Sequence, residues 1–164
     1  MNIVLIGMPG CGKSTVGVLL AKSMLMHFVD TDLVIQNAYG KSLCALIEER
    51  GLEAFKQIEN DVIASVTAEN SVIATGGSAV YGAEAMAHLG KNGRIVYLDV
   101  SVDAIKSRLS DIKTRGVAMP EGYTIDDLYA ERLPLYRKYA HVTVDCNGRT
   151  AEECVDAIVS ALNG

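Results

Sequence analysis

The chain has 164 residues, the length of one compact domain, and its hydrophobic fraction of 49% with a charged fraction of 21% excludes a disordered chain. Fifteen Lys and Arg against twenty Asp and Glu give a formal net charge of −5, which argues against a bulk electrostatic grip on nucleic acid or anionic membranes. No apolar run approaches the roughly 18 residues that span a bilayer, and the start lacks the basic region of a signal peptide, so we expect one cytoplasmic, monomeric domain over residues 1–164.

In chain order, the hydrophobic pattern predicts a strand at 2–6, a helix at 14–24, a strand ending at 28–30, helices at 32–40, 42–50 and 52–68, a strand at 71–75, a helix at 83–89, a strand at 94–100, helices at 102–109 and 126–138, a strand at 141–144, and a last helix opened by the capping box Thr150–Glu153. Strands that alternate with helices indicate an α/β fold, with a mainly parallel sheet covered by helices on both faces. Sheets of this kind bind ligands at the carboxyl ends of their strands.

One segment, 111–124, loses the periodicity and contains Gly116, Pro120 and Gly122. Regular structure resumes on both sides of it, which favours a mobile excursion within the domain over a linker between domains. We expect this excursion to serve as a lid over a ligand.

The first strand is followed by a phosphate-binding motif. Residues 7–14, GMPGCGKS, match G-x-x-x-x-G-K-[ST] between a predicted strand and a predicted helix. Glycines let successive N–H groups point at phosphate oxygens, and the helix N-terminus adds its positive dipole end. Lys13 would reach the β- and γ-phosphates, and the Ser14 hydroxyl would bind Mg²⁺. The ATP-binding candidates in this loop are Gly10, Cys11, Gly12, Lys13, Ser14 and Thr15.

Other P-loop classes fit poorly. A GTPase needs N-K-x-D, which the sequence lacks, and the D-x-x-G at Asp145–Gly148 follows the last strand rather than an early one. Large ATPases and motors need a longer chain. A small phosphotransferase remains, with a substrate pocket and a closing lid.

The second strand ends in a pair of acidic residues, Asp30 and Asp32, at the same edge as the phosphate loop. In an extended chain, residues two apart point the same way, about 6.6 Å from each other. One carboxylate could then support Mg²⁺ while the other accepts a hydrogen bond or proton from a substrate hydroxyl. The alternative is a solvated acidic loop or a cap on the following helix.

The four cysteines are scattered over the sequence, with no C-x-x-C pair (Cys11, Cys44, Cys146 and Cys154). This spacing favours reduced thiols in a cytoplasm over a disulfide scaffold, and it does not fit a zinc site. Cys11 is best explained as a small residue at a variable loop position, with a redox-sensitive thiol as the alternative.

Several stretches together resemble the shikimate kinase family, from the first strand to the last helix. They are GMPGCGKSTVG, DTD at 30–32, GLEAFKQIE, VIATGGSAV, IVYLDV, the lone Arg115 and RLPLYRKYA. The resemblance implies a nucleoside monophosphate kinase-like fold: a three-layer P-loop NTPase fold with a five-stranded parallel sheet, a substrate-binding helical region at about 32–62, and a lid. It also implies the activity, transfer of phosphate from ATP to shikimate to give the 3-phosphate in aromatic amino-acid biosynthesis.

The resemblance also implies roles for individual residues. Asp32 would hold ring hydroxyls as the candidate base, with Asp30 on the metal side. Gly76 and Gly77 would bring backbone close to the substrate, and Arg132 would bind its carboxylate, for which a planar fork is suited. Arg115 would fold over the phosphates with the lid, as the third catalytic residue beside Lys13 and Asp32. Arg108 and Arg149 would flank the adenine. For each isolated arginine the alternative is a surface salt bridge.

Three positions depart from the family pattern. Lys56 stands where the family has the arginine of F-R-x-x-E, and lysine lacks the bidentate fork, although Lys56 stays a candidate for substrate binding. Ser78 replaces the last glycine of T-G-G-G, and Gly116 follows Arg115 in place of proline. Two of these changes affect the acceptor pocket. A kinase of another small hydroxylated acid, and a nucleotide-binding module without turnover, therefore stay open as alternatives.

Overall fold

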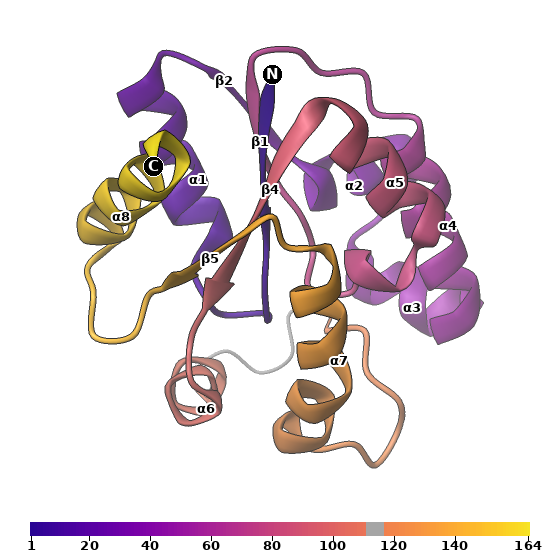
Figure 1. The fold of residues 1–164 in the computed structure, drawn as a ribbon. Helices are drawn as coiled ribbons and strands as arrows, with labels where there is room; N and C mark the ends of the chain where they lie inside the picture. The colour runs from indigo at the N-terminus through magenta and orange to yellow at the C-terminus, as the bar shows by residue number, and fades with distance from the viewer. Residues whose placement is uncertain (111–116) are drawn as a thin grey trace.

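The computed structural model describes residues 1–110 and 117–164 (Figure 1). In chain order its elements are β1 (Asn2–Ile6), α1 (Lys13–Met24), β2 (His27–Asp30), α2 (Thr31–Tyr39), α3 (Leu43–Arg50), α4 (Leu52–Ala64), β3 (Ser71–Ala74), the 3₁₀ helix η1 (Ala79–Tyr81), α5 (Ala83–Asn92), β4 (Gly93–Asp99), α6 (Val102–Ser110), α7 (Ile125–Tyr139), β5 (Val142–Asp145) and α8 (Ala151–Asn163).

The five strands of the described chain form one parallel sheet in the order β2-β3-β1-β4-β5. β1 lies at the centre and is buried along its whole length, which explains its unbroken apolar sequence. Pairing of Leu5 with Ala74, and of Asp30 with Ala74 on the other side, brings the carboxyl ends of β1, β2 and β3 to one edge. The segments that follow these strands therefore meet there, as the predicted fold requires.

Helices cover both faces of the sheet, and this gives the predicted three layers (Figure 1). On one face α1 packs against α8 and β3; on the other α5 and α7 pack against β4, with α4 beside α5. The capping box predicted at Thr150 is present, because its side chain accepts from the Glu153 N–H while the Glu153 carboxylate accepts from the Thr150 N–H.

Helices α2, α3 and α4 have a small core of their own. Ile35, Leu46, Phe55 and Ile58 pack together there, and Ala118 joins them from the far side of the 111–116 gap. This second cluster holds the helical region 31–64 as a unit beside the sheet. It also fixes the stretch after residue 116 against the same helices.

Several predicted boundaries differ from the structure. The helix predicted to reach residue 68 ends at Ala64, where the Ser65 hydroxyl donates to the Val62 carbonyl at 2.7 Å and competes with the helical bond. The helix predicted to end at residue 89 continues through Gly90 to Asn92. The 3₁₀ helix η1 was not predicted, because three residues are too few to show a period.

The predicted lid at 111–124 is only partly described: residues 111–116, and with them Arg115, lie outside the described residues, and 117–124 form turns and irregular chain. No helix in the described ranges has the length and apolar character needed to cross a membrane. All four cysteines are free, and three of them are buried.

Candidate functional site

A cavity of about 310 Å³ opens at the carboxyl edge of the sheet, between the phosphate loop, α2, α4 and α7. It is lined on one side by the loop and the start of α1 (Pro9, Gly10, Gly12, Lys13, Ser14 and Thr15) and on the other by residues from seven further segments (Asp32, Leu43, Phe55, Glu59, Thr75, Gly76, Gly77, Ser78, Leu109, Val117, Ala118 and Arg132). One continuous space therefore contains both halves of the predicted site.

The phosphate loop folds around the side chain of Lys13 and binds its ammonium group. The Lys13 ammonium, buried at 7% exposure, donates to the carbonyls of Gly7 at 2.7 Å and Met8 at 2.9 Å. Gly12 precedes α1 with φ +97°, a backbone conformation that glycine adopts without strain. The loop thus presents a helix N-terminus and a preplaced cation to the cavity, the two features that bind phosphate.

Asp30 joins the phosphate loop to α2. Its Oδ2 accepts from the Ser14 hydroxyl at 2.9 Å, and its Oδ1 caps α2 by accepting from the Asp32 N–H at 2.9 Å. The prediction of extended chain is confirmed for Asp30, the last residue of β2, but it is wrong for Asp32, because α2 begins at Thr31 and Asp32 stands in its first turn. The cap considered as an alternative is present, together with the predicted Ser14–Asp30 pair.

Two carboxylates meet at Gly76. A Cβ at this glycine would lie 2.6 Å from Asp32 Oδ1 and 2.9 Å from Glu59 Oε2, so only glycine leaves room for both. Neither oxygen has a hydrogen-bond partner within residues 1–110 and 117–164, although both are buried. Burial is costly for such groups unless a ligand supplies donors. These two oxygens are therefore places where a hydroxylated ligand would bind.

Burial also raises the pKa values of the Asp32 and Glu59 carboxyl groups. Burial, with a smaller contribution from the charge of Asp30, raises the pKa of Asp32 to about 6. Burial also raises the pKa of Glu59 to about 7; the charge of Asp32 adds to the rise, while the hydrogen bond from Ser78 and the charges of Arg132 and Lys13 oppose it. A carboxyl with a pKa close to neutrality can both accept and release a proton under ordinary conditions.

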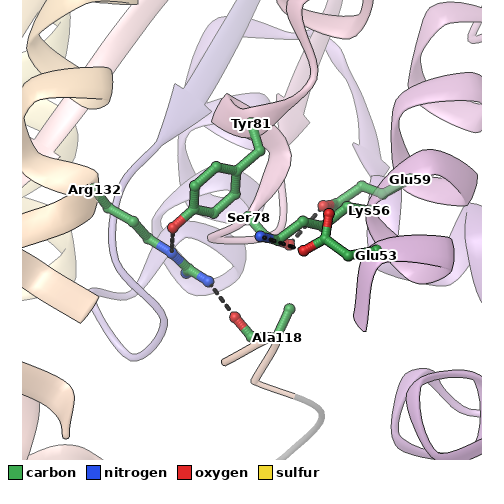
Figure 2. A network of polar contacts seen from close by, with 7 residues as sticks. All are labelled: Glu53, Lys56, Glu59, Ser78, Tyr81, Ala118 and Arg132. Atoms are coloured by element: carbon green, nitrogen blue, oxygen red, sulfur yellow. Dashed lines mark hydrogen bonds and ion pairs between the residues drawn. The ribbon is translucent and has the colours of Figure 1, made fainter. Parts of the chain in front are cut away.

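Arg132 comes from α7 and is 1% exposed (Figure 2). Its Nη2 donates to the Ala118 carbonyl at 2.6 Å and its Nε to the Tyr81 hydroxyl at 3.3 Å. Nη1 lies so close to Gly77 that a Cβ there would be 2.8 Å away. One turn along α7, the Tyr136 hydroxyl donates to the Gly77 carbonyl at 2.7 Å, which ties the helix to the turn after β3. The guanidinium is thereby fixed at the cavity wall.

Sequence reasoning left Glu59, Ser78 and Tyr81 out of the candidate site. The Ser78 hydroxyl donates to Glu59 Oε1 at 2.5 Å, and Tyr81 holds Arg132 (Figure 2). The motifs GLEAFKQIE and VIATGGSAV contain Glu59 and Ser78, so a signal was present, but their pairing over 19 residues has no local signature.

Lys56, a candidate for substrate binding, does not line the cavity. Its ammonium lies 3.4 Å from Glu53 Oε1 and 4.2 Å from the centre of the Tyr81 ring (Figure 2), and these three residues border a separate hollow. Tyr81 thus contacts both cations, because the Arg132 guanidinium lies 5.3 Å from the centre of the same ring.

Two further predicted arginines lie outside the cavity lining. Arg108 on α6 donates to the Gly10 carbonyl at 3.1 Å and so contacts the phosphate loop from its outer edge. Arg149 borders a separate surface hollow with Glu153 and Asp156. Arg115 lies outside the described residues.

Ser14 and Asp30 also offer a place for a divalent cation. Adjacent oxygen ligands of an octahedral Mg²⁺ at about 2.1 Å lie about 3 Å apart, and Ser14 Oγ and Asp30 Oδ2 are 2.9 Å apart. Within the described ranges there is no group of three His, Cys, Asp or Glu residues that could hold a metal.

Comparison with known proteins gives a consistent result. The family model described as shikimate kinase matches residues 9–163. A shikimate kinase of Francisella tularensis subsp. novicida is 38% identical over 165 residues, covering 98% of this chain and 94% of the relative. The structure is similar to a shikimate kinase from Acinetobacter baumannii in complex with shikimate (TM-score 0.89, 32% identity, 99% of this chain and 92% of that one) and to one from Aquifex aeolicus (TM-score 0.83, 33% identity, 100% and 97%).

Proposed function

Because this chain belongs to the shikimate kinase family, we propose that it transfers the γ-phosphoryl group of ATP to a hydroxyl of shikimate, giving shikimate 3-phosphate and ADP. One observation carries the proposal: a single cavity holds a phosphate loop at one end, and at the other it holds buried carboxylate oxygens that have no hydrogen-bond partner in residues 1–110 and 117–164. A phosphate donor and a hydroxyl acceptor would meet in that space, which is what in-line transfer requires.

The nucleotide would occupy the loop side. In the proposal Lys13 turns from the carbonyls of Gly7 and Met8 toward the β- and γ-phosphates, where its charge stabilises the transferring group. Residues 10–15 surround the phosphates with N–H groups and the dipole of α1. Arg108 beside Gly10 lies where it can approach the base, Arg115 is proposed to act from the lid, and Arg149 stays a candidate for the adenine.

Ser14 and Asp30 are proposed to hold Mg²⁺, and their 2.9 Å spacing fits it. When bound there, the ion would neutralise charge on the β- and γ-phosphates. Asp30 would still cap α2 through its other oxygen, which accepts from the Asp32 N–H. Asp30 would therefore link the cation to the helix that carries Asp32.

The acceptor would bind across Gly76 and Gly77. Asp32 Oδ1, which has no partner in the described chain, would accept from the hydroxyl to be phosphorylated and orient it toward the γ-phosphate. Its pKa of about 6 leaves it mostly ionised near pH 7 and able to take the proton as the hydroxyl reacts. Arg132 is proposed to bind the acceptor carboxylate through Nη1, the nitrogen that faces Gly77.

One observation favours a second acceptor, another small hydroxylated acid. Because Lys56 does not line the cavity, Arg132 is the sole Lys or Arg side chain that lines its acceptor half among the described residues. A weaker grip on a carboxylate would tolerate acceptors of other shapes.

We also infer a cytoplasmic monomer that acts on small molecules, without nucleic-acid or membrane partners. The net charge of −5 and the four free cysteines support this inference.

A coupled ADP-release assay with Mg²⁺-ATP and a panel of hydroxylated acids tests the function. We expect shikimate to give the highest kcat/KM of the panel. A higher kcat/KM with another hydroxy acid would replace the acceptor, and ATP binding without ADP release on any acceptor would leave a nucleotide-binding module without turnover.

A further inference from the structure

The turn after β3 contacts both oxygens of the Glu59 carboxylate. Gly76 makes room for Oε2, because a Cβ there would lie 2.9 Å from that oxygen. Two residues later, the Ser78 hydroxyl donates to Oε1 at 2.5 Å. The carboxylate is therefore held at one oxygen by a side chain, and its other oxygen is left in the cavity without a partner among the described residues.

The Ser78 hydroxyl does not cap the helix that follows it. Ser78 precedes the three-residue helix η1, yet its side chain makes no capping hydrogen bond. The residue is 7% exposed, so the hydroxyl is not turned to water. Within the described part of the chain its partner is Glu59, 19 positions earlier on a different element.

The nearest cation on α4 is not available to Glu59. Lys56 lies one turn before Glu59 but pairs with Glu53 and stacks on Tyr81 (Figure 2). Arg132 and Lys13 act on the Glu59 carboxylate through charge. Arg132 donates its hydrogen bonds to Ala118 and Tyr81, and Lys13 donates its own to Gly7, Met8 and Cys11. The direct bond to Oε1 thus comes from Ser78.

We propose that Ser78 is a positioning residue for the phosphoryl acceptor: its hydroxyl holds Glu59 Oε1 so that Oε2 accepts a hydrogen bond from a second hydroxyl of the substrate. This inference rests on the proposed function, since it deepens the acceptor half of the same site. Asp32 Oδ1 and Glu59 Oε2 flank Gly76 together, and an acceptor with two neighbouring hydroxyls can donate to both. A substrate with a single hydroxyl would leave one buried oxygen unpartnered, which is unfavourable.

The charges around Glu59 make the role of Ser78 measurable. Burial and the charge of Asp32 raise the pKa of Glu59 toward 7, and Ser78, Arg132 and Lys13 oppose that rise. Loss of the Ser78 hydroxyl removes a donor that favours the ionised carboxylate, so the pKa of Glu59 rises further. At pH 7 a larger fraction of Glu59 is then protonated and cannot accept at both oxygens.

The test compares Ser78→Ala with Ser71→Ala. Ser71 is also buried, its hydroxyl donates to the Glu69 carbonyl at 2.9 Å, and it lies at the opposite end of β3. We expect Ser78→Ala to raise the shikimate KM at pH 7 about tenfold, the effect of one hydrogen bond to a charged group. The acidic limb of kcat/KM for shikimate should move to higher pH, while the ATP KM stays unchanged. Ser71→Ala should keep the wild-type limb, and Ser78→Thr, which retains a hydroxyl, should restore it.

A titration independent of activity completes the test. The ¹³C NMR signal of the Glu59 carboxyl, assigned by its loss in Glu59→Gln, should titrate at higher pH in Ser78→Ala than in wild type or Ser71→Ala. Ser78→Gly gives the same comparison if the alanine variant does not fold. An unchanged Glu59 titration and an unchanged acidic limb in Ser78→Ala would overturn the proposal. If wild type releases no ADP with shikimate while the titration still shifts, the function fails and the Ser78–Glu59 positioning stands.

Discussion

The two halves of the cavity are built in opposite ways. The phosphate side comes from residues 7–15 together with Asp30 at the end of β2, and its polar groups bind one another: Lys13 binds loop carbonyls and Ser14 binds Asp30. The acceptor side collects Asp32, Glu59, Ser78 and Arg132 from four separate segments, and it keeps two carboxylate oxygens without partners in the described chain. The Lys13 and Ser14 side chains thus have hydrogen-bond partners without a ligand. The two carboxylate oxygens of the acceptor side would gain theirs from a bound ligand.

This difference predicts how each half responds to damage. A change on the phosphate side should affect the chemical step, because that side stabilises charge as it moves. A change on the acceptor side should affect recognition and stability, because buried groups there depend on one another. Asp32 is the exception on that side, because it is proposed to take the proton in the chemical step.

The largest expected effect is on the phosphate side. Lys13→Ala removes the buried ammonium, and we expect kcat to fall about 10³-fold or more, since one group that stabilises transition-state charge contributes on this order. The control is Lys22→Ala, an exposed lysine in the last turn of α1, which should retain wild-type kcat. Coupled ADP release measures both; a Lys13→Ala enzyme within tenfold of wild type would contradict the assignment.

On the acceptor side, Arg132→Lys should act mainly on KM. Lysine cannot keep the bonds to Tyr81 and Ala118 and also offer a fork to a carboxylate. We expect the shikimate KM to rise about 10- to 100-fold with the ATP KM unchanged. Arg137→Lys, exposed on the same helix, is the matched control. A shikimate KM within twofold of wild type for Arg132→Lys would remove Arg132 from the acceptor site.

Gly76→Ala sharpens the comparison through packing. The new Cβ would lie 2.6 Å from Asp32 Oδ1 and 2.9 Å from Glu59 Oε2, and we expect a loss of about 1–3 kcal/mol in the free energy of unfolding. Gly90→Ala in α5 is the control, because its Cβ would meet only Ile95 Cδ1 at an ordinary 3.5 Å; it should stabilise by up to about 1 kcal/mol. Urea unfolding compares them, and equal midpoints would refute the crowding at Gly76.

A further expected effect is a dependence of stability on pH. Burial raises the pKa of Glu59 from its usual 4.5 to about 7, so between these values the folded state binds more protons than the unfolded state. The free energy of unfolding of the ligand-free protein should therefore fall as pH rises from 4.5 to 7, and then level off. Urea midpoints at pH 5 and 8 measure this fall, which Glu59→Gln should reduce. An equal fall in that variant would place its origin elsewhere.

How far each half could be predicted follows from its construction. The phosphate loop is contiguous in the sequence, so the motif at residues 7–14 was sufficient to predict its structure. The alternation of apolar runs and helical periods was sufficient for the parallel sheet, and the capping box at Thr150 marked the start of α8 correctly.

Apart from the acidic pair at the end of the second strand, the acceptor half could be predicted only through resemblance. Glu59 and Ser78 belong to different elements, and no periodicity links them. Lys56 was predicted to bind substrate from its place in the motif. In the structure its ammonium contacts Glu53 and the Tyr81 ring, and the side chain does not line the cavity. The prediction of extended chain through Asp32 is wrong because Asp30 caps a helix that begins at Thr31. Contacts between distant segments decide each of these cases.

The most direct test of the division between the two halves is Asp32→Asn, measured for ATP affinity and for shikimate turnover in the same preparation. The variant keeps the size of the side chain but loses the charge that would orient and deprotonate the acceptor hydroxyl. We predict that the ATP Kd stays within about twofold, because Lys13 and the loop are unchanged, while ADP release with shikimate falls about 10³-fold, as for loss of a general base with its positioning role. Wild-type turnover in Asp32→Asn would contradict the account.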